Sequence, residues 1–314
     1  MRFFRRRRFV CRCVADPFPA RNAKTPCGRV ARRAQANRRR RTPMLKRNRK
    51  WAIAGALAAA LMAAPLAGTA VEQWSMATAW GGGPFLEKDA KGWATLVEKL
   101  TAGRIKIQVF PGGTLGKAIK VTDTVKSNVA QVGNTWMAYD WGVDKTTVIF
   151  AGMAGGLNPE EMIMWLFEAG GADLQFEYRK EVFGVASIPC GIFPTEIFLH
   201  SKKRIETLED FQGLKMRTAG AWAEIAGNLG ASTVILPGAE VYPALERGVI
   251  DATEWSSPSV NLPSGFHKIA KYVIMPGVHQ PAAVEECIFN MDAWNRISEN
   301  DRELIKLAGK ISVM

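Results

Sequence analysis

An arginine at the end of a predicted strand is the residue in this sequence best suited to bind an anion. Leu214 and Met216 alternate with Lys215 and Arg217, which is the two-residue period of a half-buried strand. In open α/β sheets, ligands bind beyond the carboxyl ends of the strands. A guanidinium at that point is a planar fork suited to a carboxylate. We therefore expect Arg217 to bind a carboxylate ligand, and a structural salt bridge is the alternative.

Motifs of the common enzyme classes are absent from the 314 residues. The sequence has no H-E-x-x-H zinc motif, no G-x-S-x-G nucleophile turn and no G-x-G-x-x-G dinucleotide loop. Gly116 and Lys117 superficially resemble a phosphate-binding loop, but Ala118 stands where that loop has serine or threonine. His200, His267 and His279 lack the spacing of metal ligands, so we expect them to be structural or surface residues. The sequence therefore predicts no catalytic residues.

The pattern of helices and strands around Arg217 is typical of an α/β fold. The first part of the chain reads β-α-β-α-β and predicts a largely parallel sheet with helices on both faces; its strands are expected at 73–79, 105–109 and 129–132, and its helices at 85–100 and about 117–127. Two more helices are predicted at 158–169 and 171–180, and two strands at 183–188 and 196–200 on either side of a loop at 189–194.

A second α/β unit of about 80 residues follows and contains Arg217. Thr207 and Asp210 have the spacing of a helix capping box, and a helix is predicted at 221–229. Two later strands, at 272–274 and 286–290, are predicted to return to the first unit. This pattern, taken together with the family resemblance that the motifs described below carry, favours two lobes joined by crossing hinge strands, the fold of a periplasmic binding protein, which closes around its ligand by hinge motion. We expect lobe I at 71–193 and 278–314, and lobe II at 194–277.

The positive charge of the chain is concentrated in its first 50 residues. The net charge is +13, but residues 1–50 hold 19 of the 42 lysines and arginines and one acid, Asp16. The chain from Val71 onward has 23 basic and 28 acidic residues, so a nucleic-acid partner is not predicted for it. Residues 1–43 are interpreted as a disordered or mis-assigned basic extension, with a nucleic-acid-binding arm as the alternative.

Residues 44–70 have the features of a signal peptide. Met44 is followed by a basic segment, an uncharged apolar run at 51–66 and the small residues Gly68, Thr69 and Ala70. We expect cleavage after Ala70, with a membrane anchor as the alternative. Cys190 and Cys287 are the cysteines beyond this segment. They could pair in an oxidising compartment, but two isolated cysteines are more often small buried apolar residues. At the other end, a helical pattern begins at Asp301 and has no stop signal before Met314, so we expect that helix to be cut short.

Three motifs in fixed order resemble the solute-binding proteins of tripartite ATP-independent periplasmic (TRAP) transporters. The first is the turn Phe110 to Gly116, which is similar to the family's P-G-G-x-L-G turn. The second is G-x-K-hydrophobic-R, matched by Gly213, Lys215, Met216 and Arg217. The third is the helix Y-x-A-L-x-x-G-x-hydrophobic-D, matched from Tyr242 to Asp251. These motifs lie within a resemblance that extends over roughly 73–294.

The resemblance implies a ligand site. Lobe I would contribute Trp80 and the segment Asn134 to Tyr139 to the cleft, and Trp255 would lie on the lobe II side. Keto-acid binders of the family hold a cation beside the substrate carboxylate. The positions here that correspond to that cation site are Glu196, Glu254, Trp255 and Gln280. Relatives have glutamine near Glu196 and glutamate near Gln280, so the two residue types have exchanged places in this chain.

These residues together predict a periplasmic binding subunit. We expect it to capture a small organic acid, with a 2-oxo or 2-hydroxy monocarboxylate favoured, and to deliver it to integral-membrane TRAP subunits. Na⁺ or Ca²⁺ is expected to bind with the ligand, because oxygen ligands favour hard ions over zinc, and no redox or group-transfer cofactor is expected. A sensing receptor and a periplasmic enzyme acting on a carbonyl substrate are the alternatives, and a homodimer is left open.

Overall fold

The computed structural model describes residues 71–314. The predicted basic extension at 1–43 and the predicted signal peptide at 44–70 lie outside the described residues. Among the residues described, no helix combines the length and the apolar character needed to cross a membrane.

The first sheet has five strands in the order β2-β1-β3-β10-β4. Its strands are β1 (Glu72–Thr78), β2 (Ile105–Phe110), β3 (Val132–Trp136), β4 (Val185–Phe193) and β10 (Ala283–Asn290). Strand β1 pairs in parallel with β2 and β3, while β10 runs antiparallel between β3 and β4. The predicted parallel β-α-β-α-β unit is therefore present, and a late strand enters its sheet from the far end of the sequence.

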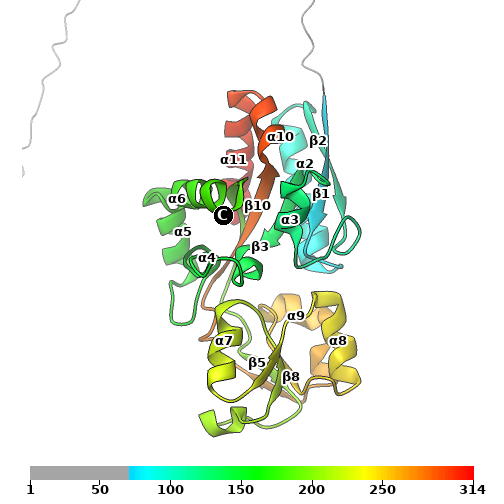
Figure 1. Ribbon diagram of the computed structural model, residues 1–314, viewed down its shortest axis with the longest axis vertical. Coiled ribbons are helices and arrows are strands. Elements are labelled where there is room, and N and C mark those ends of the chain that lie inside the picture. Colours follow the sequence, from blue (N-terminus) through cyan, green and yellow to red (C-terminus); the bar gives the residue numbers. More distant parts are fainter. Residues whose placement is uncertain (1–70) are drawn as a thin grey trace, which may run out of the picture. The chain divides into compact units, whose positions relative to one another are not determined.

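Helices and helical turns cover this sheet, and we call the whole body lobe I. They are η1 (Phe85–Ala90), α2 (Lys91–Leu100), α3 (Val121–Lys126), η2 (Met137–Asp140), α4 (Thr147–Ala151), α5 (Pro159–Glu168), α6 (Gly171–Tyr178), η3 (Arg179–Phe183), α10 (Met291–Arg296) and α11 (Glu299–Val313). Helix α11, drawn in red in Figure 1, packs against β4 and α2. The largest buried cluster includes Trp74, Trp93, Phe289 and Trp294. Aromatic side chains from both ends of the described chain therefore pack together in the core of lobe I.

Two predicted strands of lobe I are displaced in the structure. The strand predicted at 129–132 begins only at Val132, because Val129 is exposed in the turn after α3. The strand predicted at 183–188 starts at Val185 and continues through Pro189 to Phe193, where a loop was predicted. Pro189 is accommodated because the pairing of β4 with β10 shifts register opposite it, between Glu285 and Glu286.

The second sheet, in the order β7-β6-β8-β5-β9, belongs to a second body that we call lobe II. Its strands are β5 (Leu199–Ser201), β6 (Lys215–Arg217), β7 (Ser232–Val234), β8 (Ala252–Thr253) and β9 (Tyr272–Ile274). Its helices and turns are η4 (Leu208–Phe211), α7 (Gly220–Asn228), α8 (Gly238–Glu246), α9 (Pro258–Ser264) and η5 (Phe266–Lys268). The predicted capping contact is present, since Asp210 accepts a hydrogen bond from the Thr207 backbone N–H at 2.9 Å.

Strand β9 was predicted to return to the first unit, and this prediction is wrong. Tyr272–Ile274 pairs antiparallel with β5 in lobe II. Three half-exposed apolar residues at the edge of a sheet carry the same sequence pattern in either lobe, so pattern alone could not assign the partner. The strand predicted at 196–200 also begins later, at Leu199, which leaves Glu196 in the segment that precedes β5.

Two chain segments, 194–198 and 275–282, connect the sheets, and we call them the linking segments. They are bonded to each other: the Glu196 N–H donates to the Gln280 carbonyl at 3.2 Å, and the Gly277 N–H donates to the Glu196 carbonyl at 2.9 Å. A Cβ on residue 277 would collide with the Glu196 backbone, so glycine is required for this approach. Glu196 is thereby fixed between the lobes.

Cys190 and Cys287 form a disulfide between β4 and β10. The sequence favoured two unpaired buried cysteines, and the structure corrects this. The two strands are direct neighbours, so residues 97 positions apart meet across one ladder. The disulfide joins the same two strands that lead into the linking segments.

Candidate functional site

Arg217 lies at the carboxyl end of β6, as the sequence predicts, and is almost fully buried. Its Nη1 donates to Glu254 Oε1 at 3.0 Å, and its Nε donates to the Leu236 carbonyl at 3.2 Å. The indole ring of Trp255 lies against the guanidinium, 4.9 Å from its central carbon to the ring centre. These contacts fix the plane of the fork and leave Nη2 for a further acceptor.

Glu254 meets Arg217 because their strands are parallel neighbours. Strand β8 pairs with β6 so that Thr253 lies opposite Arg217, and Glu254 is the next residue. The carboxyl ends of parallel strands meet at the same sheet edge, which brings the acid and the guanidinium together there. One carboxylate oxygen of Glu254 is held by Arg217, and the other remains for a ligand or an ion.

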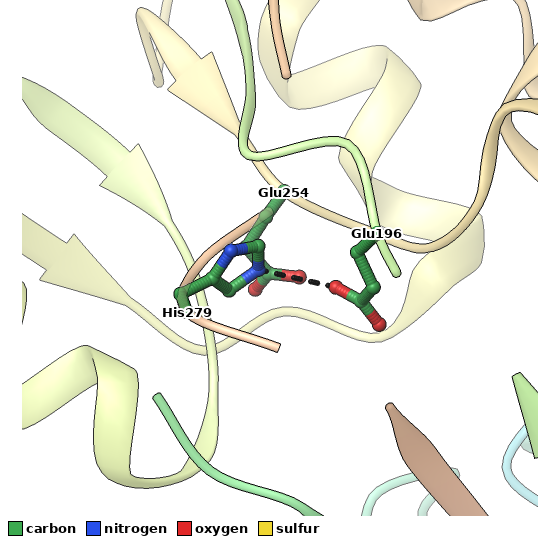
Figure 2. Close-up of side chains that lie close together, drawn as sticks. All are labelled: Glu196, Glu254 and His279. Atoms are coloured by element: carbon green, nitrogen blue, oxygen red, sulfur yellow. Dashed lines mark hydrogen bonds and ion pairs between the residues drawn. The ribbon is translucent and has the colours of Figure 1, made fainter. Parts of the chain in front are cut away.

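The third charged residue, Glu196, comes from the first linking segment and faces His279 from the second. His279 Nε2 lies 3.1 Å from Glu196 Oε2. Figure 2 shows Glu196, Glu254 and His279 turned toward one another. One potential ligand atom from each of the three lies within 4.8 Å of the others, and all three residues are buried. The structure therefore assembles a potential cation site from lobe II and both linking segments.

Burial controls the protonation of this cluster. It raises the pKa of Glu196 well above its usual value, and the nearby charge of Glu254 raises that pKa further, while Arg217 opposes the shift. Burial lowers the pKa of His279 to about 4, so its imidazole is neutral near pH 7. Two carboxylates this close need a compensating charge before both can ionise, and Arg217 supplies only one.

A small cavity adjoins the cluster between the lobes. It is lined by Trp80, Phe85, Trp136, Tyr139, Phe193, Glu196, Arg217, Glu254, Trp255 and Ala283. Lobe I contributes most of the aromatic rings, lobe II contributes Arg217 and Glu254, and the first linking segment contributes Glu196. The space is about 30 Å³, against roughly 10–15 Å³ for one water molecule. A cavity of this size and polarity suits a ligand of a few non-hydrogen atoms with an anionic end.

Trp80, Tyr139 and Trp255, which were predicted to bind substrate, all line this cavity. Asn134 does not line it. The predicted strand at 129–132 would have ended just before Asn134, but Asn134 lies inside β3 and is fully buried. Its Oδ1 accepts a hydrogen bond from Trp80 Nε1, and its Nδ2 lies 3.4 Å from the sulfur of Cys190. Asn134 thus supports Trp80 from behind.

Gln280, a predicted cation ligand, has its amide nitrogen engaged elsewhere. It donates to the carbonyls of Ala151, at 3.1 Å, and Ala282. The neighbouring His279 is the residue that approaches Glu196 and Glu254 instead. His279 was predicted from the sequence to be a structural or surface residue. Its place beside a predicted cation ligand was the one available signal, but histidine spacing alone could not reveal donors that come from separate segments.

Comparison with known proteins gives a family match over most of the described residues. The profile of the bacterial extracellular solute-binding proteins, family 7, matches residues 76–311. The monocarboxylate 2-oxoacid-binding periplasmic protein of Nostoc sp. is 33% identical over 239 residues. That match covers 75% of this chain and 65% of the relative, so the chain spans about two thirds of the length of that protein.

Solved structures show the same fold. A TRAP solute-binding protein of Pseudoalteromonas atlantica T6c with bound sodium and pyruvate has a TM-score of 0.73 and 33% identity, over 77% of this chain and 74% of that one. A protein of Colwellia psychrerythraea with bound calcium and pyruvate has a TM-score of 0.73 and 32% identity, with the same coverage. One of Bordetella bronchiseptica RB50, with calcium and picolinate, has a TM-score of 0.75 and 26% identity, over 78% and 73%.

Proposed function

Because the chain belongs to family 7 of the bacterial extracellular solute-binding proteins, we propose that it captures a small organic acid and presents it to the membrane subunits of a TRAP transporter. The favoured ligands are 2-oxo and 2-hydroxy monocarboxylates. The similar Nostoc sp. protein is named as a monocarboxylate 2-oxoacid-binding protein, and two similar solved structures contain pyruvate. Binding and release are the whole task, so we propose no covalent chemistry at this site.

The observation that carries the proposal is the incomplete pairing of Arg217 at the cavity. The guanidinium is buried and oriented by Glu254, Leu236 and Trp255, yet it also lines the space between the lobes. A carboxylate in that space can accept a charge-assisted hydrogen bond from Nη2. Hydrogen bonds to charged groups are worth about 1.5–3 kcal/mol, and more is lost when a buried charge stays unpaired.

We propose that a cation binds beside the ligand, held by Glu196 and Glu254. Both carboxylates are buried and close together, and Arg217 balances one of them. An added cation would balance the other and would attract the carboxylate of the ligand. Na⁺ and Ca²⁺ both accept oxygen ligands, and these ions are present in the pyruvate-bound neighbours.

The aromatic walls would select for small ligands. The rings of Trp80 and Phe85 lie 4.6 Å apart, and Phe85 packs against Phe193 at the same centre-to-centre distance. Trp80 is held by two acceptors, Asn134 and Glu285, the latter at 2.9 Å. A wall fixed in this way cannot easily move aside, so longer acids should be bound more weakly.

The test is calorimetric titration of the wild-type chain with pyruvate, 2-oxobutyrate and lactate in buffer that contains Na⁺ or Ca²⁺. Methyl pyruvate is the matched control, since it keeps the keto group and lacks the charged carboxylate. We expect the acids to bind and the ester not to bind. Binding of the ester as tightly as pyruvate, or no binding of any acid, would contradict the proposal.

A further inference from the structure

His279 adds a nitrogen donor to a site for which the sequence predicted oxygen donors. Its Nε2 lies 3.1 Å from Glu196 Oε2 and, with Glu254, completes a group of three potential ligands. The residue is buried and is held by aromatic rings, with the ring centres of Phe198 and Trp222 5.5 Å and 5.6 Å away. Its position is therefore set by the linking segment and by lobe II packing.

We propose that His279 is a direct ligand of the bound cation and enables this site to take a divalent first-row transition ion, such as Zn²⁺ or Co²⁺. The inference rests on the proposed function, since it concerns the cation beside the organic acid. Imidazole suits these metals, whereas Na⁺ and Ca²⁺ favour oxygen ligands. Two carboxylates and one imidazole on one side of the ion leave its other positions for the ligand.

The spacing of the donor atoms fits a small ion. Ligands that bind at 2.0–2.2 Å and subtend 90–109° lie about 2.8–3.6 Å apart. The 3.1 Å between His279 Nε2 and Glu196 Oε2 falls in this range. The three donor atoms lie within 4.8 Å of one another, so the widest pair would close by up to about 2 Å for all three to bind on one side of the ion.

The charge balance also favours a divalent ion. With both glutamates ionised, Arg217 leaves the cluster one negative charge in excess. A divalent ion and a monocarboxylate ligand together bring the buried total to zero, whereas a sodium ion and the same ligand leave it negative. Uncompensated buried charge is costly, so the divalent ion is the better match to a single carboxylate.

The experiment uses the metal alone. The full chain is stripped with a chelator and titrated with Co²⁺, Zn²⁺ and Ca²⁺, with Co²⁺ absorption and quenching of the cavity tryptophans as readouts. His279→Asn is compared with His267→Asn, which replaces an exposed histidine. We expect His279→Asn to weaken Zn²⁺ and Co²⁺ binding at least roughly tenfold and Ca²⁺ binding by less than about threefold, with no change in His267→Asn.

Equal Zn²⁺ affinity in His279→Asn and wild type would overturn the inference, and so would an equal loss of Zn²⁺ and Ca²⁺ affinity, which would assign His279 to packing only. If His279→Asn does not fold, X-ray absorption of the Zn²⁺-loaded wild type decides, with scattering from a bound imidazole expected and its absence contradictory. Pyruvate binding to the wild-type chain in Ca²⁺ is measured separately. If wild type binds pyruvate but shows no histidine–metal bond, only this inference is refuted. If wild type does not bind pyruvate, the proposed function is refuted.

Discussion

Two buried arginines in this protein have similar surroundings but differ in how many of their guanidinium nitrogens donate hydrogen bonds. Arg179, in lobe I, donates from all three guanidinium nitrogens: Nε to Glu286 at 3.0 Å, Nη1 to Asp140 at 2.8 Å, and Nη2 to Thr122 at 3.0 Å. Arg217 donates from two, to Glu254 and Leu236. Each guanidinium lies over an aromatic ring, Phe183 in one case and Trp255 in the other.

The comparison shows that burial does not distinguish a structural arginine from a binding arginine. The exposed fraction is 0% for Arg179 and 2% for Arg217. What differs is the set of hydrogen bonds, which is complete in lobe I and incomplete at the cavity. The Arg179 cluster joins η3, η2, α3 and β10 within one lobe. The Arg217 cluster lies where the lobes meet, and a ligand can complete it only there.

The largest expected effect is the loss of stability when the Arg179 cluster is broken. Arg179→Met leaves Glu286 and Asp140 buried without a cation and should lower the free energy of unfolding by about 3–5 kcal/mol. Arg104→Met is the control, because it breaks a partly exposed pair with Asp301 and should cost about 1 kcal/mol or less. Urea unfolding measures both. Equal losses in the two variants would show that the Arg179 cluster is not a structural centre.

Glu285, the neighbour of Glu286 in β10, should make the stability of lobe I depend on pH. Burial raises its pKa well above the usual value, and the charge of Asp89 adds to the shift. The folded state then binds a proton that the unfolded state has released, so stability should fall as pH rises above about 4.5, by up to about 1.4 kcal/mol per pH unit. Glu285→Gln stays neutral and should flatten this decline. Parallel stability curves for wild type and variant between pH 5 and 7 would contradict the assignment.

Closure of the lobes should affect ligand binding at the Arg217 cluster and should not affect the Arg179 cluster. A Cβ on Gly81 would lie 2.9 Å from Ala239 Cβ at the start of α8, whereas a Cβ on Gly82 would contact nothing within 4 Å. Gly81→Ala should hold the lobes apart and weaken pyruvate binding about fivefold, which corresponds to roughly 1 kcal/mol. Gly82→Ala is the control and should bind like wild type. The same loss in both variants would mean that the effect comes from loop stiffness.

The smallest expected effect concerns an exposed ion pair between the lobes. Lys145 lies 2.7 Å from Glu224 of α7. Exposed pairs contribute about 0.2–1 kcal/mol and are screened by salt. Lys145→Ala should therefore weaken pyruvate binding less than about fivefold at low salt and leave it unchanged at high salt. Lys91→Ala, which breaks the exposed pair with Glu87 inside lobe I, should have no effect in calorimetry. A salt-independent loss in Lys145→Ala would point to another cause.

The sequence predicted the family, the two-lobed fold and the location outside the cytoplasm, and the family match confirms these predictions. The period-two pattern that ends at Arg217 and the helix signals around it were local features, so they were readable without a structure. The partner of β9 was not readable, because three edge residues do not encode which strand they meet.

Contacts between distant segments were also beyond the sequence. The disulfide depends on β4 and β10 being neighbours, and the place of Asn134 depends on where β3 begins. His279 approaches Glu196 only because the two linking segments are bonded to each other. Each of these contacts comes from tertiary structure, to which residue type and spacing give no access.

The most direct test of the central claim is the titration of Arg217 variants with pyruvate. Arg217→Lys keeps the charge but loses the fork, so affinity should fall at least roughly tenfold. Arg217→Met should abolish detectable binding. Thermal unfolding of each ligand-free variant must be measured in parallel, because Glu254 loses its guanidinium partner in both. If Arg217→Met remains folded and binds pyruvate as tightly as wild type, Arg217 is a structural arginine like Arg179 and the proposed site is wrong.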